Sequence, residues 1–158
     1  MRRTFQETLL LEMKNDDKIF LLIGDLGYKM WDNHFKEFPD RTINCGASEQ
    51  AMLDIAVGLA YDGKIPVCYS ITPFLIYRPF ETLRTYIDYE KLPVKLVGSG
   101  RNKDYSHDGV SHWADDIGLY LGQLNNIKQF WPKTKKDVEK MTHDFIYGRS
   151  PAFISLAR

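Results

Sequence analysis

Short apolar runs alternate with amphipathic segments along this chain, and this alternation limits its fold more than any other feature. The clearest runs are Ile19–Ile23, Ile65–Ile71 and Ala152–Leu156. Apolar runs of strand length that lack strict alternation with polar residues suit strands buried on both faces of a parallel sheet. Further strands are expected at residues 41–45, 93–98 and 127–130.

Amphipathic helices are expected between these strands, because apolar residues recur there every three to four positions. The expected helices cover residues 3–15, 32–38, 49–61, 74–89, 113–121 and 135–147, and within 74–89 a true helix start is expected near Pro79. About six strand–helix alternations predict an α/β fold, a three-layer sandwich whose mostly parallel sheet of about six strands has helices on both faces. The 158 residues suit a single domain, 1–158, that buries its own core.

Composition excludes several classes of function. Lysine plus arginine equals aspartate plus glutamate, at 21 each, which argues against general binding to nucleic acid or to an anionic membrane. No apolar run approaches the roughly 18 residues that span a bilayer, and no signal peptide is evident, so a cytoplasmic protein is expected. Cys45 and Cys68 both fall in expected buried strands, without the paired spacing of a metal site, so reduced core thiols and no metal ligands are expected.

One acidic residue stands at a junction where ligands commonly bind. The turn Asn44–Ser48 joins an expected strand to the helix that begins at Glu49. Ligands of open α/β sheets gather at the carboxyl ends of the strands. A carboxyl group held there away from water can exchange a proton with a ligand near neutral pH. An ordinary explanation also exists, because the helix dipole favours an acidic first turn and Ser48 could be the N-cap.

A second group of candidates follows the strand that ends at Ile71. Phe74 and Tyr77 could form a stacking wall for a flat heterocycle, and Arg78 could bind an anion. The alternative is that the two aromatic residues, at helical spacing, belong to the core and that Arg78 is a surface side chain.

A third group lies in the polar stretch from Ser99 to His112, after the next strand. His107, Asp108 and His112 surround a glycine and could orient hydroxyl groups and shuttle protons. The alternative is a polar loop in which Ser111 caps a helix that starts at Trp113.

A weaker signal follows the first strand. Gly24–Gly27 reads Gly-Asp-Leu-Gly, which lacks the lysine and the hydroxyl residue of a P-loop. The segment is therefore interpreted as a turn that could approach a ligand through Asp25.

Taken together and in order, these segments resemble the pyrimidine-binding domain of thiamine diphosphate enzymes, in particular the transketolase and deoxyxylulose-phosphate synthase group. The resemblance extends over nearly the whole chain. The matching stretches are Gly24–Leu26, Asn44–Met52, Ala56–Ala60, Phe74–Arg78 and Asp108–His112.

The resemblance implies roles for the cofactor-binding residues. Glu49 matches the glutamate that hydrogen-bonds nitrogen N1′ of the aminopyrimidine, and it would act catalytically by activating the cofactor as a nucleophile toward a ketose. Phe74 matches the aromatic residue that stacks on the pyrimidine, and Tyr77 a nearby aromatic residue. Asp25 is expected close to the cofactor.

The same resemblance implies a sugar-binding loop. Asp108 and His112 match residues that face sugar hydroxyls, His112 with a catalytic role, and His107 and Arg78 are further candidates for contact with the substrate. The loop reads Asp-Gly-Val-Ser-His where the family usually has Asp-Gly-Pro-Thr-His, so the identity of the substrate stays open.

The family's diphosphate-binding domain, with its Gly-Asp-Gly…Asn-Asn motif, has no match in the chain. The resemblance therefore implies one subunit of a split enzyme, whose partner subunit binds the diphosphate and Mg²⁺, with two copies of each chain. The expected reaction is two-carbon ketol transfer between sugars or sugar phosphates. The alternatives are a β-type subunit of a 2-oxo acid dehydrogenase or decarboxylase, a deoxyxylulose-phosphate-synthase-like enzyme, and a non-catalytic homologue that binds a partner.

Overall fold

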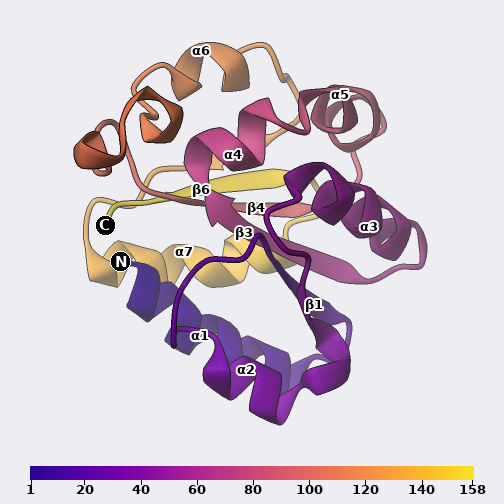
Figure 1. Cartoon of the computed structure of the whole chain (residues 1–158). Helices are drawn as coiled ribbons and strands as arrows, with labels where there is room; N and C mark the ends of the chain where they lie inside the picture. The colour runs from indigo at the N-terminus through magenta and orange to yellow at the C-terminus, as the bar shows by residue number, and fades with distance from the viewer.

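The protein contains a six-stranded parallel sheet between two layers of helices (Figure 1). The structure is a computed structural model and describes residues 1–158. The strands are β1 (Ile19–Ile23), β2 (Thr42–Asn44), β3 (Ile65–Ile71), β4 (Lys95–Ser99), β5 (Lys128–Phe130) and β6 (Ala152–Leu156). Their spatial order is β2-β1-β3-β4-β6-β5, and every neighbouring pair is parallel. The predicted α/β sandwich is confirmed.

Helices cover both faces of the sheet (Figure 1). The helices on one face are α1 (Arg2–Asn15), α2 (Asp32–Glu37) and α7 (Lys135–Tyr147). Those on the other face are α3 (Glu49–Tyr61), α4 (Thr72–Tyr77), α5 (Phe80–Thr82), the π-helical turn η2 (Leu83–Tyr89) and α6 (Ile117–Leu121). Three short 3₁₀ turns complete the chain: η1 (Pro39–Arg41), η3 (Ser106–Asp108) and η4 (Val110–His112).

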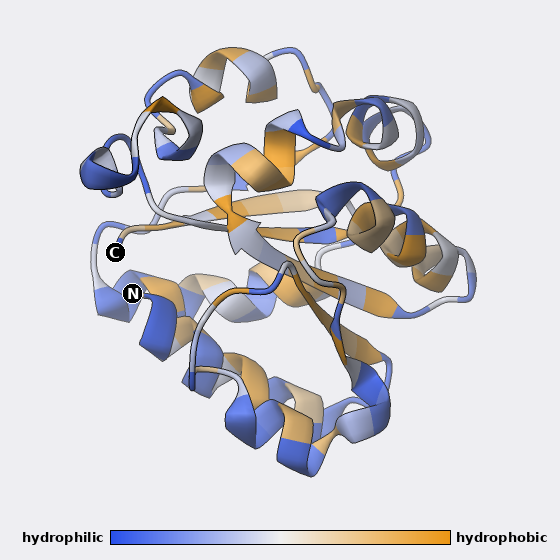
Figure 2. Ribbon diagram, viewed as in Figure 1, coloured by the Kyte–Doolittle hydropathy of each residue, from blue (hydrophilic) through white to orange (hydrophobic).

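Side-chain alternation along each strand divides the core into two clusters of equal size, 17 buried residues on each face. In β1, Leu21 packs toward α1 and α7, whereas Leu22 packs toward α3. Both faces of the strands are therefore buried, which explains their continuous apolar sequence. Figure 2 shows the apolar strands at the centre and the polar sides of the helices facing outward.

Two of the expected helices differ from the structure. Within residues 74–89 the helix restarts after Pro79, as expected, because Pro79 has no N–H to continue α4; the difference is that the segment after α5 adopts the wider π-helical turn. The helix expected at Trp113 begins only at Ile117, since Ala114 is held by a bridge to Asn102. Ser111 therefore caps no helix.

The second and fourth strands also differ slightly from expectation. The second strand is limited to Thr42–Asn44, so Cys45 lies just beyond it and is half-buried, contrary to the expected place in a buried strand. The fourth covers Lys95–Ser99 rather than 93–98.

Cys68 is fully buried in β3, and both cysteines are free, as expected. Burial raises the pKa of both thiols. No helix has the length and apolar character needed to cross a membrane.

Candidate functional site

The candidate segments meet at one edge of the sheet. In the order β2-β1-β3-β4, the four strands are neighbours, and each is followed by one segment: α3, the turn at Gly24–Gly27, α4 and the loop of residues 100–113. Because the strands are parallel, their carboxyl ends lie side by side. The residues predicted from four separate stretches of sequence therefore lie at the same edge of the sheet, where α/β sheets commonly bind ligands.

Glu49 is the buried acidic group of this region. It is the first residue of α3, and only 1% of its surface is exposed. Its Oε1 accepts a hydrogen bond from Oγ of Ser70 at 2.7 Å, and its Oε2 accepts one from Nη1 of Arg78 at 2.6 Å. Ser70 lies two residues after Cys68 in β3 and therefore points to the same face of the sheet, toward α3. Ser70 in β3 and Arg78 just after α4 thus hold one carboxylate oxygen each.

Gly24 brings the backbone of β1 close to this carboxylate. A Cβ atom at Gly24 would lie 2.9 Å from Oγ of Ser70 and 3.0 Å from Oε1 of Glu49. A larger residue would have to displace one of these oxygens. The β1 side of the carboxylate is therefore closed by backbone, and Arg78 borders the opposite oxygen.

Phe74 provides a flat apolar surface beside the carboxylate. The guanidinium carbon of Arg78 lies 3.8 Å from the centre of the Phe74 ring. The imidazole of His112 meets the same ring edge-on, with 4.8 Å between ring centres. The structure thus brings together Glu49, Phe74, Arg78 and His112, four of the residues predicted from the sequence.

Tyr77 and Asp25 lie farther from this centre. The ring of Tyr77 packs on Tyr120 at 4.7 Å, and its hydroxyl group donates a hydrogen bond to Asp116. Asp25 adopts a left-handed backbone with φ of 53° and accepts a hydrogen bond from Nδ2 of Asn44 at 3.0 Å. Neither residue has a hydrogen bond or a ring contact with Glu49 or Phe74 in the structure.

The loop histidines differ in position. His107 lies outermost and is paired with Asp108, 3.2 Å from Nε2 to Oδ2. His112 lies inside the loop, where Nδ1 is 3.0 Å from Oγ of Ser111 and the ring rests against Phe74. Only His112 of these three predicted residues therefore contacts the centre of the site.

Sequence reasoning did not single out Ser70 or Tyr105. Ser70 is a polar residue in an otherwise apolar buried strand, and that exception is a signal that could have identified it. The hydroxyl group of Tyr105 lies 2.9 Å from Oγ of Ser99 and accepts a hydrogen bond from Arg2 at 3.0 Å. Its ring lies against Gly100, where φ is 86° and any Cβ would be 2.4 Å from the ring. The only sequence signal for this close contact was Gly100, a glycine that directly follows β4.

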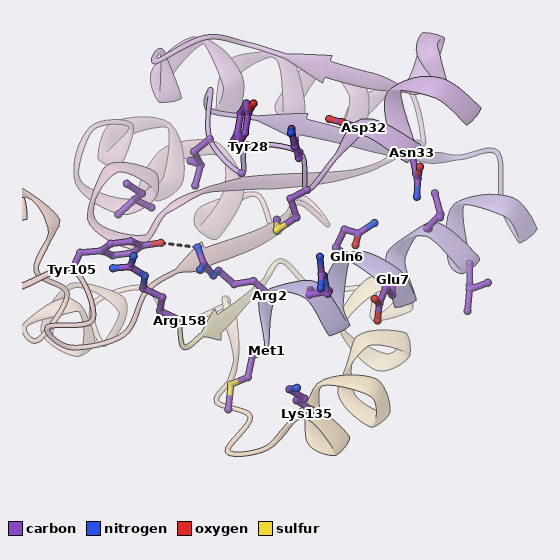
Figure 3. Close-up of a pocket in the computed structure, with 18 residues that line it drawn as sticks. Met1, Arg2, Gln6, Glu7, Tyr28, Asp32, Asn33, Tyr105, Lys135 and Arg158 are labelled. Atoms are coloured by element: carbon purple, nitrogen blue, oxygen red, sulfur yellow. Dashed lines mark hydrogen bonds between the residues drawn. The ribbon is translucent and has the colours of Figure 1, made fainter.

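A cavity of about 1170 Å³ adjoins Tyr105, between the start of α1 and the loop after β1 (Figure 3). Five basic side chains and two acidic ones line it, and none of the five forms an ion pair. The basic residues are Arg2, Arg3, Lys29, Lys135 and Arg158. Because the whole chain has no net charge, this local excess of positive charge favours anionic groups.

The parallel sandwich and its strand-end site together define an α/β ligand-binding domain. Residues 1–158 match the family model described as "Transketolase, pyrimidine binding domain", and the chain belongs to this family. The family resemblance seen in the sequence is thereby confirmed.

Two curated relatives are described as a transketolase subunit and a transketolase section. The chain is 35% identical over 122 residues to an apulose-4-phosphate transketolase subunit of Actinobacillus succinogenes, covering 77% of this chain and 39% of that protein. It is 30% identical over 160 aligned positions to "Putative transketolase C-terminal section" of Methanocaldococcus jannaschii, covering 100% and 50%. The chain therefore spans half or less of the length of these relatives.

Two solved structures share the fold of this chain. A structure described as "Split gene transketolase, inactive beta4 tetramer" superposes with a TM-score of 0.86 at 28% identity, covering 99% of this chain and 51% of that one. The transketolase of Campylobacter jejuni superposes with a TM-score of 0.87 at 19% identity, covering 99% and 25%. The second likeness supports the fold alone.

Proposed function

We propose that this chain is the subunit of a split, thiamine diphosphate-dependent, transketolase-like enzyme that binds the aminopyrimidine ring of the cofactor. The observation that carries the proposal is the position of a buried carboxylate, Glu49, near a partly buried aromatic ring, Phe74, at the strand ends, where the Arg78 side chain contacts both. These residues fit an aminopyrimidine, which needs a carboxyl group that shares a proton with a ring nitrogen and a flat surface for stacking. Residues 1–158 would form one pyrimidine-binding domain.

Glu49 is proposed to hold a proton at ring nitrogen N1′. Its burial keeps water from competing for that proton, and Ser70 orients the carboxylate by holding Oε1. When bound, thiamine diphosphate supplies the nucleophilic carbon and the electron sink for ketol transfer. Phe74 would stack on the pyrimidine, with Asp25 and Tyr77 contacting outer parts of the cofactor.

The loop after β4 is proposed to bind the sugar. His112 reaches the site beside Phe74, so it can orient a hydroxyl group of the substrate and move a proton there. His107 and Asp108 would bind outer hydroxyl groups. The basic cavity beside Tyr105 favours a substrate that carries a phosphate or another anionic group.

A partner subunit is proposed to complete the cofactor site. The chain has no group of three or more His, Cys, Asp or Glu side chains arranged to hold a metal ion. It also lacks a Gly-Asp-Gly…Asn-Asn segment. We therefore assign Mg²⁺ and the diphosphate to a second polypeptide, in an assembly with two copies of each chain. The related protein described as an inactive β tetramer is consistent with a subunit that needs its partner.

Calorimetry tests whether the cofactor site needs both polypeptides. Thiamine diphosphate with Mg²⁺ is titrated into this chain, into the candidate partner, and into their mixture. Tight, Mg²⁺-dependent binding is expected for the mixture and not for this chain by itself. Tight binding to this chain without the partner would contradict the split-enzyme proposal.

A paired assay tests the reaction. The reconstituted pair is given a ketose phosphate with an aldose acceptor, and separately a 2-oxo acid. Ketol transfer is expected, because His112 places a hydroxyl-orienting group beside the proposed ring site. Turnover of the 2-oxo acid alone would favour the 2-oxo acid dehydrogenase or decarboxylase alternative. No turnover by a pair that binds the cofactor would favour a non-catalytic homologue.

A further inference from the structure

The side chain of Arg78 makes both of the contacts that the proposed site offers to a pyrimidine. Its Nη1 donates to Oε2 of Glu49 at 2.6 Å, and its guanidinium carbon lies 3.8 Å from the centre of the Phe74 ring. A guanidinium is flat, carries N–H donors on its edge and stacks on aromatic faces. It therefore satisfies the same acceptor and the same aromatic surface as an aminopyrimidine would.

The neighbouring groups leave no second place for a ring at this carboxylate. Oε1 of Glu49 is held by Ser70, and Gly24 closes that side with backbone so near that even one added carbon would touch both oxygens. A ring nitrogen must therefore approach Oε2, the atom that Arg78 contacts.

We propose that Arg78 occupies the pyrimidine position in the cofactor-free chain and has to swing away before the cofactor binds. This inference rests on the proposed function, and it adds a self-contact that competes with the cofactor. The side chain is free to move, since 45% of it is exposed and its one hydrogen bond is the bond to Glu49. It lies at the break between α4 and α5, just before Pro79, where no regular helix holds it.

The contact between Arg78 and Glu49 also stabilises the subunit while it is separate from its partner. A buried carboxylate without a partner is destabilising, and Glu49 is almost wholly buried. Arg78 supplies a cation until the cofactor and partner subunit arrive. The competition reduces the affinity for the pyrimidine, by about tenfold for one exposed charged hydrogen bond with a cation–π contact.

The test uses the isolated full chain and the cofactor fragment 4-amino-5-hydroxymethyl-2-methylpyrimidine, with affinity measured by NMR titration. Arg78→Met removes the guanidinium and keeps the length of the side chain, and Arg78→Lys keeps the charge without the flat fork. Arg84→Met is the matched control, because Arg84 is exposed on η2 and its side chain forms no hydrogen bond or ion pair. Arg78→Met should bind about tenfold tighter than wild type, Arg78→Lys should fall between them, and Arg84→Met should match wild type.

A second substitution separates this inference from the proposed function. Phe74→Ala combined with Arg78→Met should lose the fragment. If the fragment binds and depends on Phe74, but Arg78→Met binds equally or more weakly than wild type, the inference is overturned and the proposed function stands. If Arg78→Met binds the fragment equally well with and without Phe74, the proposed function fails instead. Absence of binding by Arg78→Met overturns the inference as well.

Discussion

Arg78 and Glu49 form an ion pair that links the break after α4 to the first residue of α3, with 2.6 Å between Nη1 and Oε2. The two partners differ in freedom, because 45% of the Arg78 side chain is exposed and only 1% of the Glu49 side chain. Ser70 anchors the buried partner from the other side. A ligand can therefore replace the cation without disturbing the carboxylate.

Replacement of Phe74 tests the stacking surface. Phe74→Ala should lower the affinity of the assembled pair for thiamine diphosphate by about tenfold or more, because the flat surface beside Glu49 is lost. Calorimetry measures the change. Tyr89→Ala is the control, since Tyr89 is 81% exposed at the end of η2 and lines neither cavity of the strand-end region. Equal affinities for Phe74→Ala and wild type would remove Phe74 from the cofactor site.

A single methyl group at Gly24 tests the positioning of the carboxylate. Gly24→Ala would place its Cβ 3.0 Å or less from Oε1 of Glu49 and Oγ of Ser70, so one of them must shift. The turnover of the assembled pair should fall by about tenfold or more, since small displacements of reacting groups are costly. Gly118→Ala, where an added Cβ meets nothing within 4 Å, should leave turnover unchanged. Equal rates for both variants would show that this close approach has no catalytic role.

His34 predicts how stability depends on pH. The ring is fully buried in contact with Trp31, without a hydrogen bond at either nitrogen, and burial lowers its pKa to about 4. Between pH 4 and 6.5 the unfolded chain binds a proton that the folded chain does not, so stability should rise with pH in this window and level off above it. The difference between the ordinary histidine pKa of 6.5 and the lowered pKa of His34 corresponds to about 3 kcal/mol in the free energy of unfolding.

Denaturant titrations between about pH 4.5 and 7.5 measure this slope. His34→Phe removes the titrating group and should flatten the dependence, whereas His143→Gln, at an exposed position on α7, should retain it. A slope that is the same in wild type and His34→Phe would assign the pH dependence to other groups.

Local sequence patterns predicted much of the fold, with limits that have a physical cause. Ile19–Ile23 and Ile65–Ile71 have the expected ends, because polar residues or glycine bound each apolar run. Residues 74–89 were expected to be helical with a true helix start near Pro79, and α5 begins directly after this proline. The spacing of buried residues such as Leu83 and Ile87 does not distinguish an α-helix from the π-helical turn that they form. The late start of α6 depends on a bridge between Asn102 and Ala114, a contact that no local pattern specifies.

The candidate site was predicted in outline and not in its contacts. The rule that ligands bind at strand ends placed Glu49, Phe74 and His112 at one edge, and the structure brings Phe74 into contact with His112. The ion pair of Arg78 with Glu49 could not be foreseen, because it joins two segments 29 positions apart in the sequence. The catalytic and binding roles of these residues stay predictions.

The most direct test of the central claim is the turnover of the assembled pair after Glu49→Gln. Glutamine can still accept the hydrogen bond from Ser70, so the fold and the assembly with the partner should persist. Activity should fall by about a hundredfold or more, because the group that holds a proton at the pyrimidine is gone. Glu139→Gln, on the exposed side of α7, should have full activity. A Glu49→Gln pair that turns over at the wild-type rate would contradict the assignment of Glu49 as the residue that activates the cofactor.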